Sequence, residues 1–375
     1  MAAADEIGEP FRKAVTGGSV VKKKICFAMT SIIGNGVTRV VSILLDEIDY
    51  DQYDVSVLLT RKISHARALN PKARILEVSK DLGSGIRGKI DNVRELHQIL
   101  KKENFDVIFA LGDYAAMYVL LACYGIRAKR IVSERNDPNR EPDKKMFRRL
   151  RDILYRSADA IVCQTSDAAR YYENIVRRRV VIPNPVSGSL PMYTGAEREK
   201  RIVNFCRIDG QKNLPMLVDA FGEFVKDHPE YILEIYGNGP DEEIIRAYIR
   251  EKGLDDTVVM KDFSPSIHEK VLHAGMFVST SDFEGMSNSM LESMAMGLPV
   301  ICTDCPIGGA HEVIESGKNG ILIPVNDRGA LLEAMNLVAN FPETAQRMSE
   351  QAVKIRQRLS KSKISSQWWA LLEDE

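Results

Sequence analysis

The 375-residue chain has no apolar run long enough to cross a lipid bilayer. Its longest apolar stretch, residues 114–126, is shorter than the roughly 20 residues that a membrane-spanning helix needs, so we expect a buried helix there. Residues 1–21 also lack the apolar core of a secretory signal peptide. We therefore expect no membrane-spanning segment, and we interpret residues 1–21 as a disordered tail or a vector-derived remnant that precedes the fold.

Cysteine is scarce and shows no metal-binding pattern. The six cysteines are scattered, at positions 26, 123, 163, 206, 302 and 305. Cys302 and Cys305 form a CxxC pair, but no second Cys or His pair at metal-ligand spacing accompanies them. The pattern argues against a zinc or redox site. It favours buried free thiols in a reducing compartment, and hence a cytoplasmic location.

Net charge is almost absent, because 51 Lys and Arg oppose 52 Asp and Glu. The balance hides an asymmetry. Residues 1–185 hold 32 Lys and Arg against 23 Asp and Glu, whereas the remainder hold 19 against 29. A basic half favours an anionic membrane surface or an anionic acceptor such as a lipid diphosphate. The alternative is that these charges are solvated faces without a partner. We expect no nucleic-acid partner.

Strand-like and helix-like segments alternate along most of the chain. One series of β-rich runs extends from residue 24 to residue 165, and a second extends from residue 201 to residue 324. This alternation predicts an α/β fold with two doubly wound parallel-sheet domains in tandem. The expected boundaries are an N-terminal domain at 22–182, a Pro-rich linker at 183–199, a C-terminal domain at 200–360 and a last helix at 361–375.

Residues 276–303 predict a strand, a polar loop and a helix. Ser287 or Asn288 can cap the start of this helix, Gly297 suits the position just past its end, and Pro299 prevents continuation. The backbone N–H groups before the helix have no partner inside it, and the helix dipole adds positive charge there. These groups predict a phosphate seat. The residues that would form it are Gly285, Met286, Ser287 and Asn288.

Two carboxylates flank this seat, Glu284 in the loop and Glu292 about one turn into the helix. Neither can bind phosphate, because like charges repel. Each can accept two hydrogen bonds from neighbouring hydroxyls, as a ribose or a hexose offers. The pattern indicates a nucleotide sugar, and the alternative is an ordinary capped helix with one solvated glutamate.

Two cations and one further loop would complete the site. Arg207 ends the first strand of the second series and Lys212 follows in the loop, so both would point into the cleft between the domains. There they would neutralise a diphosphate leaving group. Asn238 lies in a GNGP loop whose acidic neighbours repel phosphate, which favours a place beside the nucleobase.

A glycine-containing loop follows the first predicted strand. Gly34 and Gly36 would let the backbone approach a diphosphate closely, although a simple tight turn is the alternative. The loop is not a dinucleotide fingerprint, because Arg39 occupies the third glycine position.

Glu284 and Glu292, with seven residues between them in SDFEGMSNSMLESMAMGLPV, resemble the glutamate pair of the retaining glycosyltransferases of family 4, which have the GT-B fold. The resemblance covers nearly all of the C-terminal half in the family's order, through the further segments 201–213, 233–240, 258–263 and 305–324. It implies catalytic roles for Glu284, Arg207 and Lys212. It also implies that Glu284 holds the transferred sugar and that Glu292 holds the ribose.

The same resemblance implies that the backbone at Phe263 holds the base and that the last helix crosses back to the first domain. Arg135 stands near the place where many members of that family carry a histidine that contacts the donor sugar, so we expect Arg135 to contact the donor, and the alternative is an arginine paired with Glu134 or Asp137. Asp282 and Glu284 are not a metal-binding DxD pair in this reading, because Lys212, Arg207 and the helix end already supply positive charge. We expect no metal and no other cofactor.

We therefore hypothesise a retaining transferase that moves a hexose or N-acetylhexosamine from a nucleoside diphosphate sugar, with UDP the expected nucleotide. The acceptor would bind mainly to the N-terminal domain and would be a saccharide or a lipid-linked saccharide in surface polysaccharide synthesis. Two alternatives are a nucleotide-sugar epimerase or hydrolase of the same architecture, and a non-catalytic nucleotide-sugar-binding protein.

Residues 141–158 predict a basic amphipathic helix, with Met146, Leu150, Ile153 and Leu154 on one stripe. Such a helix can lie on the inner face of an anionic membrane. More often the apolar stripe packs on the core of its own domain and the basic face is solvated.

Overall fold

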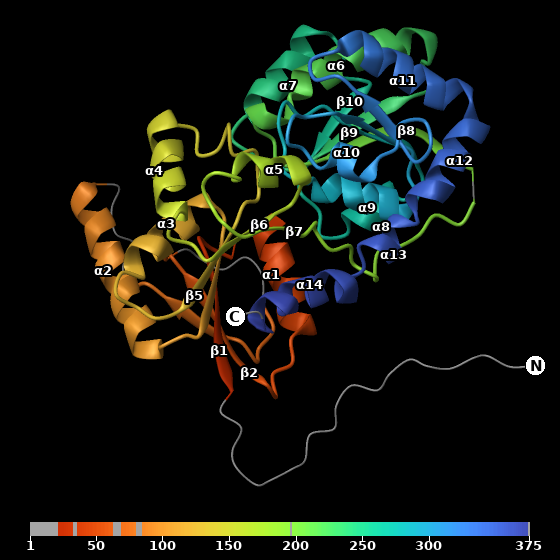
Figure 1. Ribbon diagram of the computed structural model, residues 1–375. Coiled ribbons are helices and arrows are strands. Elements are labelled where there is room, and N and C mark those ends of the chain that lie inside the picture. The colour runs from red at the N-terminus through yellow and green to blue at the C-terminus, as the bar shows by residue number, and fades with distance from the viewer. Residues whose placement is uncertain (1–21, 33–35, 63–68, 80–84, 196, 374–375) are drawn as a thin grey trace, which may run out of the picture.

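The computed structural model describes residues 22–32, 36–62, 69–79, 85–195 and 197–373 (Figure 1). The predicted tail at 1–21 and Gly34 lie outside the described residues. Two sheets with helices on both faces form two lobes, and every strand pairing between named strands is parallel. The predicted fold class, a tandem pair of doubly wound α/β domains, is confirmed.

The first sheet has the strand order β3-β2-β1-β4-β5-β6-β7. The strand order reverses between β1 and β4, so ligands are expected at the carboxyl ends of these two strands. Its strands are β1 Lys23–Met29, β2 Tyr53–Leu59, β3 Arg74–Glu77, β4 Val107–Leu111, β5 Lys129–Ser133, β6 Ala160–Cys163 and β7 Arg179–Val181. Its helices are α1 Gly36–Glu47, α2 Ile86–Glu103, α3 Asp113–Ala122, α4 Lys145–Tyr155 and α5 Ser166–Tyr171.

The second sheet has the order β10-β9-β8-β11-β12-β13, with its reversal between β8 and β11. Its strands are β8 Glu199–Phe205, β9 Ile232–Tyr236, β10 Val258–Lys261, β11 Ala274–Ser279, β12 Val300–Thr303 and β13 Ile321–Ile323. The helical elements are the 3₁₀ turn Gly210–Lys212 and α6 Leu214–Asp227, α7 Glu242–Glu251, α8 Ile267–Val271, α9 Asn288–Met296, α10 Ala310–Val313, α11 Arg328–Asn340, α12 Pro342–Ala352 and α13 Ile355–Arg358.

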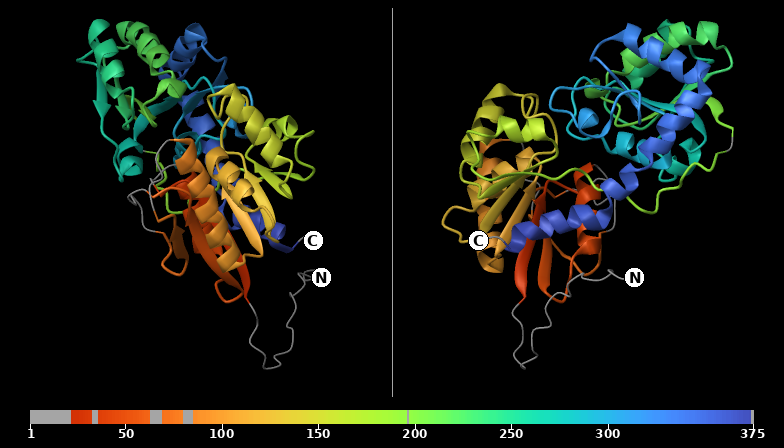
Figure 2. Two further views of the ribbon diagram at one scale, coloured as in Figure 1. Left: turned by 90° about the vertical axis from the view of Figure 1, so that its left-hand side faces the viewer. Right: turned by 45° about the vertical axis from the view of Figure 1, so that its right-hand side comes forward.

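The last helix, α14 (Lys361–Glu373), returns to the first lobe, as Figure 2 shows. Trp368 is fully buried with its ring 5.6 Å from Phe109, and Trp369 meets Phe27 at 6.4 Å, both edge to face. Phe27 and Phe109 lie on the neighbouring strands β1 and β4. The expected return of the C-terminal helix is confirmed, because aromatic burial against the first sheet holds it there.

The packing of α4 corrects one expectation. Most of its apolar stripe does not pack on the core, because Met146 is 67%, Leu150 40% and Ile153 61% exposed, and only Leu154 of the stripe packs against the core. Arg151 is instead fully buried, where it donates to the carboxylate of Asp152 and the hydroxyl of Tyr171. Hydrogen bonds satisfy the buried guanidinium and turn the apolar stripe outward.

Candidate active site between the two sheets

Helix α9 begins and ends where its sequence indicates. Ser287 is the N-cap, and its Oγ accepts a hydrogen bond from the backbone N–H of Met290 at 3.3 Å. Gly297 ends the helix in the left-handed conformation, with φ 81°. The capping role of Ser287 is confirmed, and the first-turn N–H groups open toward the loop before the helix.

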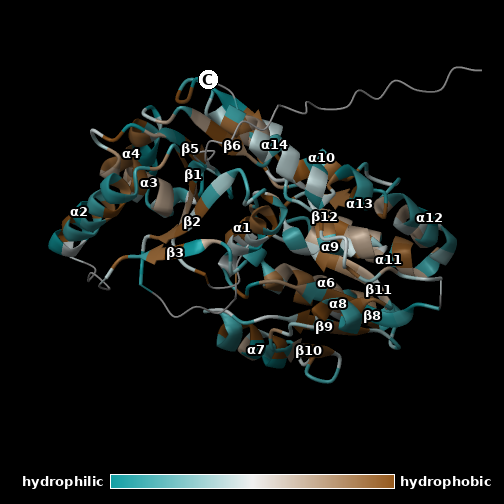
Figure 3. Cartoon of the chain, turned by 90° about the horizontal axis from the view of Figure 1, so that it is seen from below, coloured by the Kyte–Doolittle hydropathy of each residue, from teal (hydrophilic) through white to brown (hydrophobic). Residues whose placement is uncertain are grey.

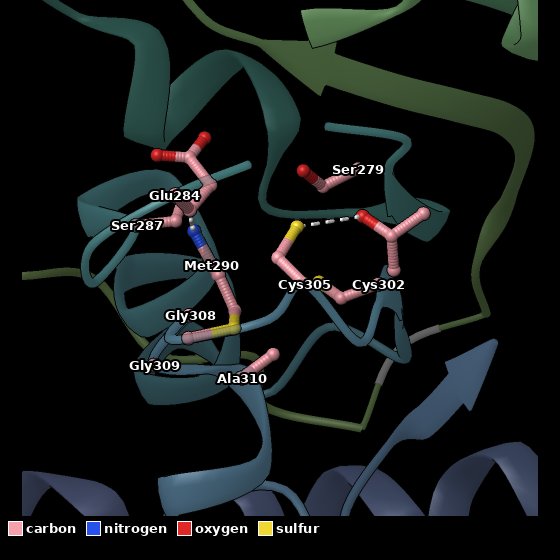
Figure 4. A pocket seen from close by; sticks show the side chains of 10 residues that line it. Ser279, Glu284, Ser287, Met290, Cys302, Cys305, Gly308, Gly309 and Ala310 are labelled. Carbon is pink, nitrogen blue, oxygen red and sulfur yellow. Dashed lines mark hydrogen bonds between the residues drawn. The ribbon is translucent and has the colours of Figure 1, made fainter. Parts of the chain in front are cut away.

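Glu284 lies in that loop, and three side chains hold its carboxylate. Lys212 Nζ pairs with Oε1, the Ser281 hydroxyl lies 2.9 Å from Oε1, and Gln211 Nε2 lies 3.2 Å from Oε2. The Lys212 and Glu284 side chains are only 16% and 17% exposed. Figure 4 shows Glu284 beside Ser287 at a small cavity of about 10 Å³. The structure thus brings together two predicted catalytic residues that lie 72 positions apart.

The surroundings of Lys212 favour its charged form. Burial lowers the pKa of the ammonium group, but the carboxylate of Glu284 and the thiol of Cys206 outweigh it, so the pKa lies above its usual value. A raised folded-state pKa means that this pair stabilises the fold below the ordinary lysine pKa. That contribution is lost only as the pH rises through the raised value. Lys212 is therefore a fixed cation at neutral pH.

The loop before α9 also touches the first domain. The backbone N–H of Met286 donates to Gln164 Oε1 at 3.1 Å. A Cβ at Gly285 would lie 2.2 Å from the same oxygen and 2.7 Å from the carbonyl oxygen of Arg135. Only glycine leaves room for so close an approach of the two domains.

Asn184 ties this loop to Arg135. The Asn184 amide nitrogen donates to the carbonyl of Met286 at 3.0 Å and to Asn288 Oδ1 at 2.9 Å. Its oxygen accepts from Arg135 Nη2 at 2.5 Å and from Gln164 Nε2 at 2.7 Å. Burial lowers the pKa of Arg135 to about 10. Its guanidinium thus takes part in the contact between the domains, and its predicted contact with a donor sugar stays a prediction.

Glu292, the second predicted carboxylate, is buried and bound from both domains. Its Oε1 pairs with Arg39 on α1, and its Oε2 lies 2.6 Å from His268 Nε2 on α8. Burial, followed by the charge of Arg39, lowers the pKa of His268 to about 4, so the imidazole is neutral at pH 7. A Cβ at Gly36 would lie 3.0 Å from Asn288 Nδ2, so the first turns of α1 and α9 adjoin.

Other predicted residues lie apart from this cluster. Arg207 is 71% exposed and pairs with Asp209 at 3.1 Å, so it is not among the groups that hold Glu284. Asn238 accepts from the backbone N–H of Phe263 at 3.0 Å, and the Phe263 ring is 66% exposed. These two residues form one loop pair at the ends of β9 and β10.

The first domain carries a pocket of about 260 Å³ at the carboxyl ends of β1, β4 and β5. Its polar lining includes the carboxyl groups of Asp113, Glu134 and Glu141 beside the guanidinium of Arg135. Burial, followed by the neighbouring carboxylates, raises the pKa of Glu141. Burial, followed by the charge of Glu134, also raises the pKa of Asp113 well above its usual value, so the carboxyl groups of this pocket can donate as well as accept hydrogen bonds.

The sequence reasoning missed four residues of the cluster. Gln164, Asn184 and Arg39 come from the first domain or the linker, and their partners lie more than a hundred positions away. His268 lies 24 positions from Glu292, in a segment that carries no motif. Gln164, Asn184 and Arg39 become functional candidates only because the two lobes lie close together, whereas His268 meets Glu292 within the second domain. One indication for Arg39 was present in the sequence, because it lies one helical turn after Gly36, in the helix that follows the expected diphosphate-binding loop.

The described residues contain no group of three or more His, Cys, Asp or Glu side chains arranged to hold a metal ion. Within the same residues, no helix combines the length and the apolar character needed to span a membrane. All six cysteines are free, and five of them are buried, as their scatter indicated.

Both halves of the chain match family models. Residues 34–189 match Glycosyltransferase Family 4, and residues 193–355 match Glycosyl transferases group 1. The two matches together cover every strand of both sheets except β1, and they include the loop and helix that carry Glu284 and Glu292.

Two curated relatives are glycosyltransferases, and this chain covers very different shares of their own lengths. The chain is 31% identical over 173 residues to the Bacillus subtilis poly(glycerol-phosphate) alpha-glucosyltransferase. This match covers 46% of this chain but only 25% of that protein. It is 22% identical to the Campylobacter jejuni GalNAc-alpha-(1->4)-GalNAc-alpha-(1->3)-diNAcBac-PP-undecaprenol alpha-1,4-N-acetyl-D-galactosaminyltransferase, over 94% of this chain and 98% of that one.

Solved structures share the fold. The Anabaena protein Alr3699/HepE, crystallised with UDP and glucose, superposes with a TM-score of 0.80 at 17% identity, over 94% of this chain and 100% of that one. Sucrose-phosphate synthase from Thermosynechococcus elongatus gives 0.80 at 16% identity, over 94% and 98%. Both confirm the GT-B architecture of two facing parallel-sheet domains. With this fold and both family matches, the chain belongs to the family 4 (group 1) glycosyltransferases.

Proposed function

We propose that the protein is a retaining, metal-independent glycosyltransferase that moves a hexose or N-acetylhexosamine from a UDP-sugar to a saccharide acceptor. One observation carries the proposal. The Lys212–Glu284 pair, the open N-terminus of α9 and the first-domain residues Gln164 and Asn184 all converge on the loop 284–288. A cation, a helix end and a hydroxyl-binding carboxylate within one loop suit a sugar diphosphate.

In this proposal the diphosphate binds at the start of α9. The N–H groups at the start of α9 and the helix dipole stabilise the charge that develops as the diphosphate leaves, and the ammonium group of Lys212 adds to this stabilisation. Arg207 is exposed at the neighbouring strand end, where its long side chain is available to a bound diphosphate. Positive charge from these groups takes the role that Mg²⁺ has in other phosphate sites.

Glu284 would accept hydrogen bonds from hydroxyls of the transferred sugar, and Glu292 from the ribose diol. Asn238 and the backbone at Phe263 would border the base, because they lie at the adjacent strand ends of the same sheet. The crystallised relative with bound UDP and glucose supports UDP as the nucleotide.

Retention of configuration is proposed by front-side attack. The acceptor oxygen forms its bond to the anomeric carbon on the face from which the diphosphate departs, and the acceptor proton passes to a phosphate oxygen. The Glu284 carboxylate is committed to Lys212, Ser281 and Gln211, so it positions the sugar and does not act as the nucleophile. This route needs no further base on the protein.

The acceptor would enter the first-domain pocket beside Arg135. Its carboxyl groups suit the hydroxyls of a neutral saccharide, since they accept hydrogen bonds from hydroxyl groups and donate one where they are protonated. A relative that acts on an undecaprenyl-diphosphate-linked glycan supports a lipid-linked saccharide in surface polysaccharide synthesis. The sugar end would lie in the pocket and the lipid end outside it.

A basic and apolar face on α2 and α4 would hold the protein on the cytoplasmic face of the membrane. Ile86, Ile90, Met146, Leu150 and Ile153 are exposed. The exposed cations on the same two helices and at the start of α4 are Arg87, Lys89, Lys144, Lys145 and Arg149. Lys89 Nζ lies 5.4 Å from the Phe147 ring centre, which joins the two helices into one face at the end of the first lobe (Figure 3). Exposed apolar side chains ringed by cations are typical of an interfacial helix.

Replacing Met146 and Ile153 by glutamate should lower binding to phosphatidylglycerol vesicles by about tenfold or more, because each change removes apolar contact and adds repulsion. Vesicle co-sedimentation measures the effect. Ile244, which is 64% exposed on α7 of the other lobe, gives the matched control, and Ile244→Glu should bind as the unmodified protein does. Equal binding of both variants would contradict the membrane role of this face.

The proposed transfer is tested with a panel of UDP-, GDP- and ADP-sugars, with diphosphate release measured with and without lipid-linked saccharide acceptors. We expect release from UDP-sugars that depends on the acceptor. Release or isomerisation without any acceptor would indicate a hydrolase or epimerase, and donor binding without turnover would indicate a sensor. Full activity in EDTA is expected, and loss of activity that Mg²⁺ restores would contradict metal independence.

A further inference from the structure

The carboxylate of Glu292 is shared by the two domains. Arg39 reaches it from α1 of the first domain, and His268 reaches it from α8 of the second. The Glu292 side chain is only 7% exposed, so these contacts leave little of it open to a ligand. His268 is neutral at pH 7, so of these two partners Arg39 alone compensates the charge of Glu292.

This contact conflicts with the role that the proposed function gives to Glu292. A ribose diol needs the oxygen atoms of that carboxylate as hydrogen-bond acceptors. Arg39 and His268 occupy both oxygens. A nucleotide can therefore reach Glu292 only if one of these side chains moves.

Arg39 is the one whose position suits the move. It lies one turn beyond Gly36, and Gly36 adjoins the side chain of Asn288 at the first turn of α9. Its guanidinium therefore lies near the place where the diphosphate would bind. A planar guanidinium binds two phosphate oxygens at once, and its charge does not depend on pH in the neutral range.

We propose that Arg39 is a donor-binding residue that exchanges partners, from the Glu292 carboxylate in the empty protein to the diphosphate of a bound nucleotide. This inference rests on the proposed function, because it takes a nucleoside diphosphate as the ligand. The ribose hydroxyls replace Arg39 on Glu292, and the displaced guanidinium binds the phosphates. Each charge thus keeps a partner at every stage, and the first domain is drawn onto the donor.

The exchange makes nucleotide and nucleoside behave differently. A nucleoside would have to displace Arg39 from Glu292 and would offer no phosphate in return. The affinity of the protein for a nucleoside is therefore low. A nucleoside diphosphate offers that phosphate. Removing the Arg39 side chain should therefore weaken the diphosphate and strengthen the nucleoside.

Calorimetric titration of the full chain with UDP and with uridine tests the exchange in Arg39→Ala and Arg39→Lys. For Arg39→Ala we expect UDP affinity to fall by about 10- to 100-fold and uridine affinity to rise severalfold, as expected for loss of a charge-assisted bond to phosphate. Arg39→Lys keeps the charge but loses the bidentate geometry, so its UDP affinity should lie between the two. Arg94→Ala, which breaks an exposed ion pair with Asp91 on α2, is the matched control and should change neither affinity.

The outcomes distinguish failure of the Arg39 exchange from failure of the proposed function. Affinities unchanged in both Arg39 variants would overturn the exchange, and so would equal weakening of UDP and uridine, which a purely structural role predicts. Thermal unfolding identifies a variant that has lost its fold, and Arg39→Lys, the smaller change, then decides. Failure of the unmodified protein to bind UDP, GDP or ADP would overturn the proposed function itself. Normal UDP binding with an indifferent Arg39 would overturn this inference alone.

Discussion

Replacement of Lys212 by alanine should lower the rate of glycosyl transfer by about 10²–10³-fold, which corresponds to roughly 3–4 kcal/mol of transition-state stabilisation. The ammonium group is largely buried and its pKa is raised, so it brings a fixed positive charge to the place where the diphosphate departs. A charge in a site shielded from water is worth more than one on the surface. The measurement is kcat from initial rates of UDP release at saturating donor and acceptor.

Lys212→Ala also leaves the Glu284 carboxylate without its paired cation. The Glu284→Ala variant should likewise reduce kcat by orders of magnitude, because the hydroxyls of the transferred sugar lose their hydrogen-bond acceptor. The double variant should be little worse than either single one, since residues that act as a unit are strongly non-additive. The two side chains would then be assigned to one catalytic step.

Lys252 gives a matched control for this prediction. It forms a comparable lysine–carboxylate pair, with Asp219 at 2.7 Å, on the outer helices of the same domain. Lys252→Ala should retain nearly full activity. Near-normal turnover of Lys212→Ala, in a protein with an unchanged unfolding temperature, would contradict the catalytic assignment of the pair.

Local signals in the sequence were sufficient for the framework of the site. Ser287 and Gly297 fix both ends of α9 by capping chemistry that involves only near neighbours. The two tryptophans of α14 need a large apolar surface, and the family resemblance indicated the first sheet as that surface. Glu284 and Lys212 could both be assigned to the site from the sequence, because each follows a strand of one parallel sheet, but their ion pair was not predicted.

The rest depends on contacts that no local pattern encodes. Asn184 bonds to Met286 and Asn288 across more than a hundred residues, and Arg39 meets Glu292 across a still longer separation. Of the two alternatives for the apolar stripe of α4, core packing was wrong for most of the stripe, because hydrophobic periodicity treats every arginine as solvent-exposed. Arg151 finds enough hydrogen-bond partners to be buried, and the apolar stripe faces outward instead.

Substitution of Gly285 by alanine should reduce transfer by about 10²-fold or more, because it separates the two domains at the site of reaction. The new Cβ would lie 2.2 Å from Gln164 Oε1 and 2.7 Å from the carbonyl oxygen of Arg135, so the loop or the first domain has to shift. A displacement of about 1 Å between bound reactants can cost 10²-fold in rate. Initial rates of UDP release measure the loss, and UDP affinity should fall less than kcat because most of the donor contacts belong to the second domain.

One of the two clashes involves the side chain of Gln164, and the other involves the backbone carbonyl of Arg135. Gln164→Ala removes the side-chain obstacle and leaves the backbone carbonyl of Arg135 in place, so Gly285→Ala/Gln164→Ala should recover only part of the activity. Gly188 provides the control, since a Cβ there meets nothing within 4 Å, and Gly188→Ala should be fully active. Unimpaired transfer by Gly285→Ala would mean that the domains do not need this close contact during catalysis. Complete recovery in the double variant would mean that the Gln164 side chain, and not the backbone, sets their separation.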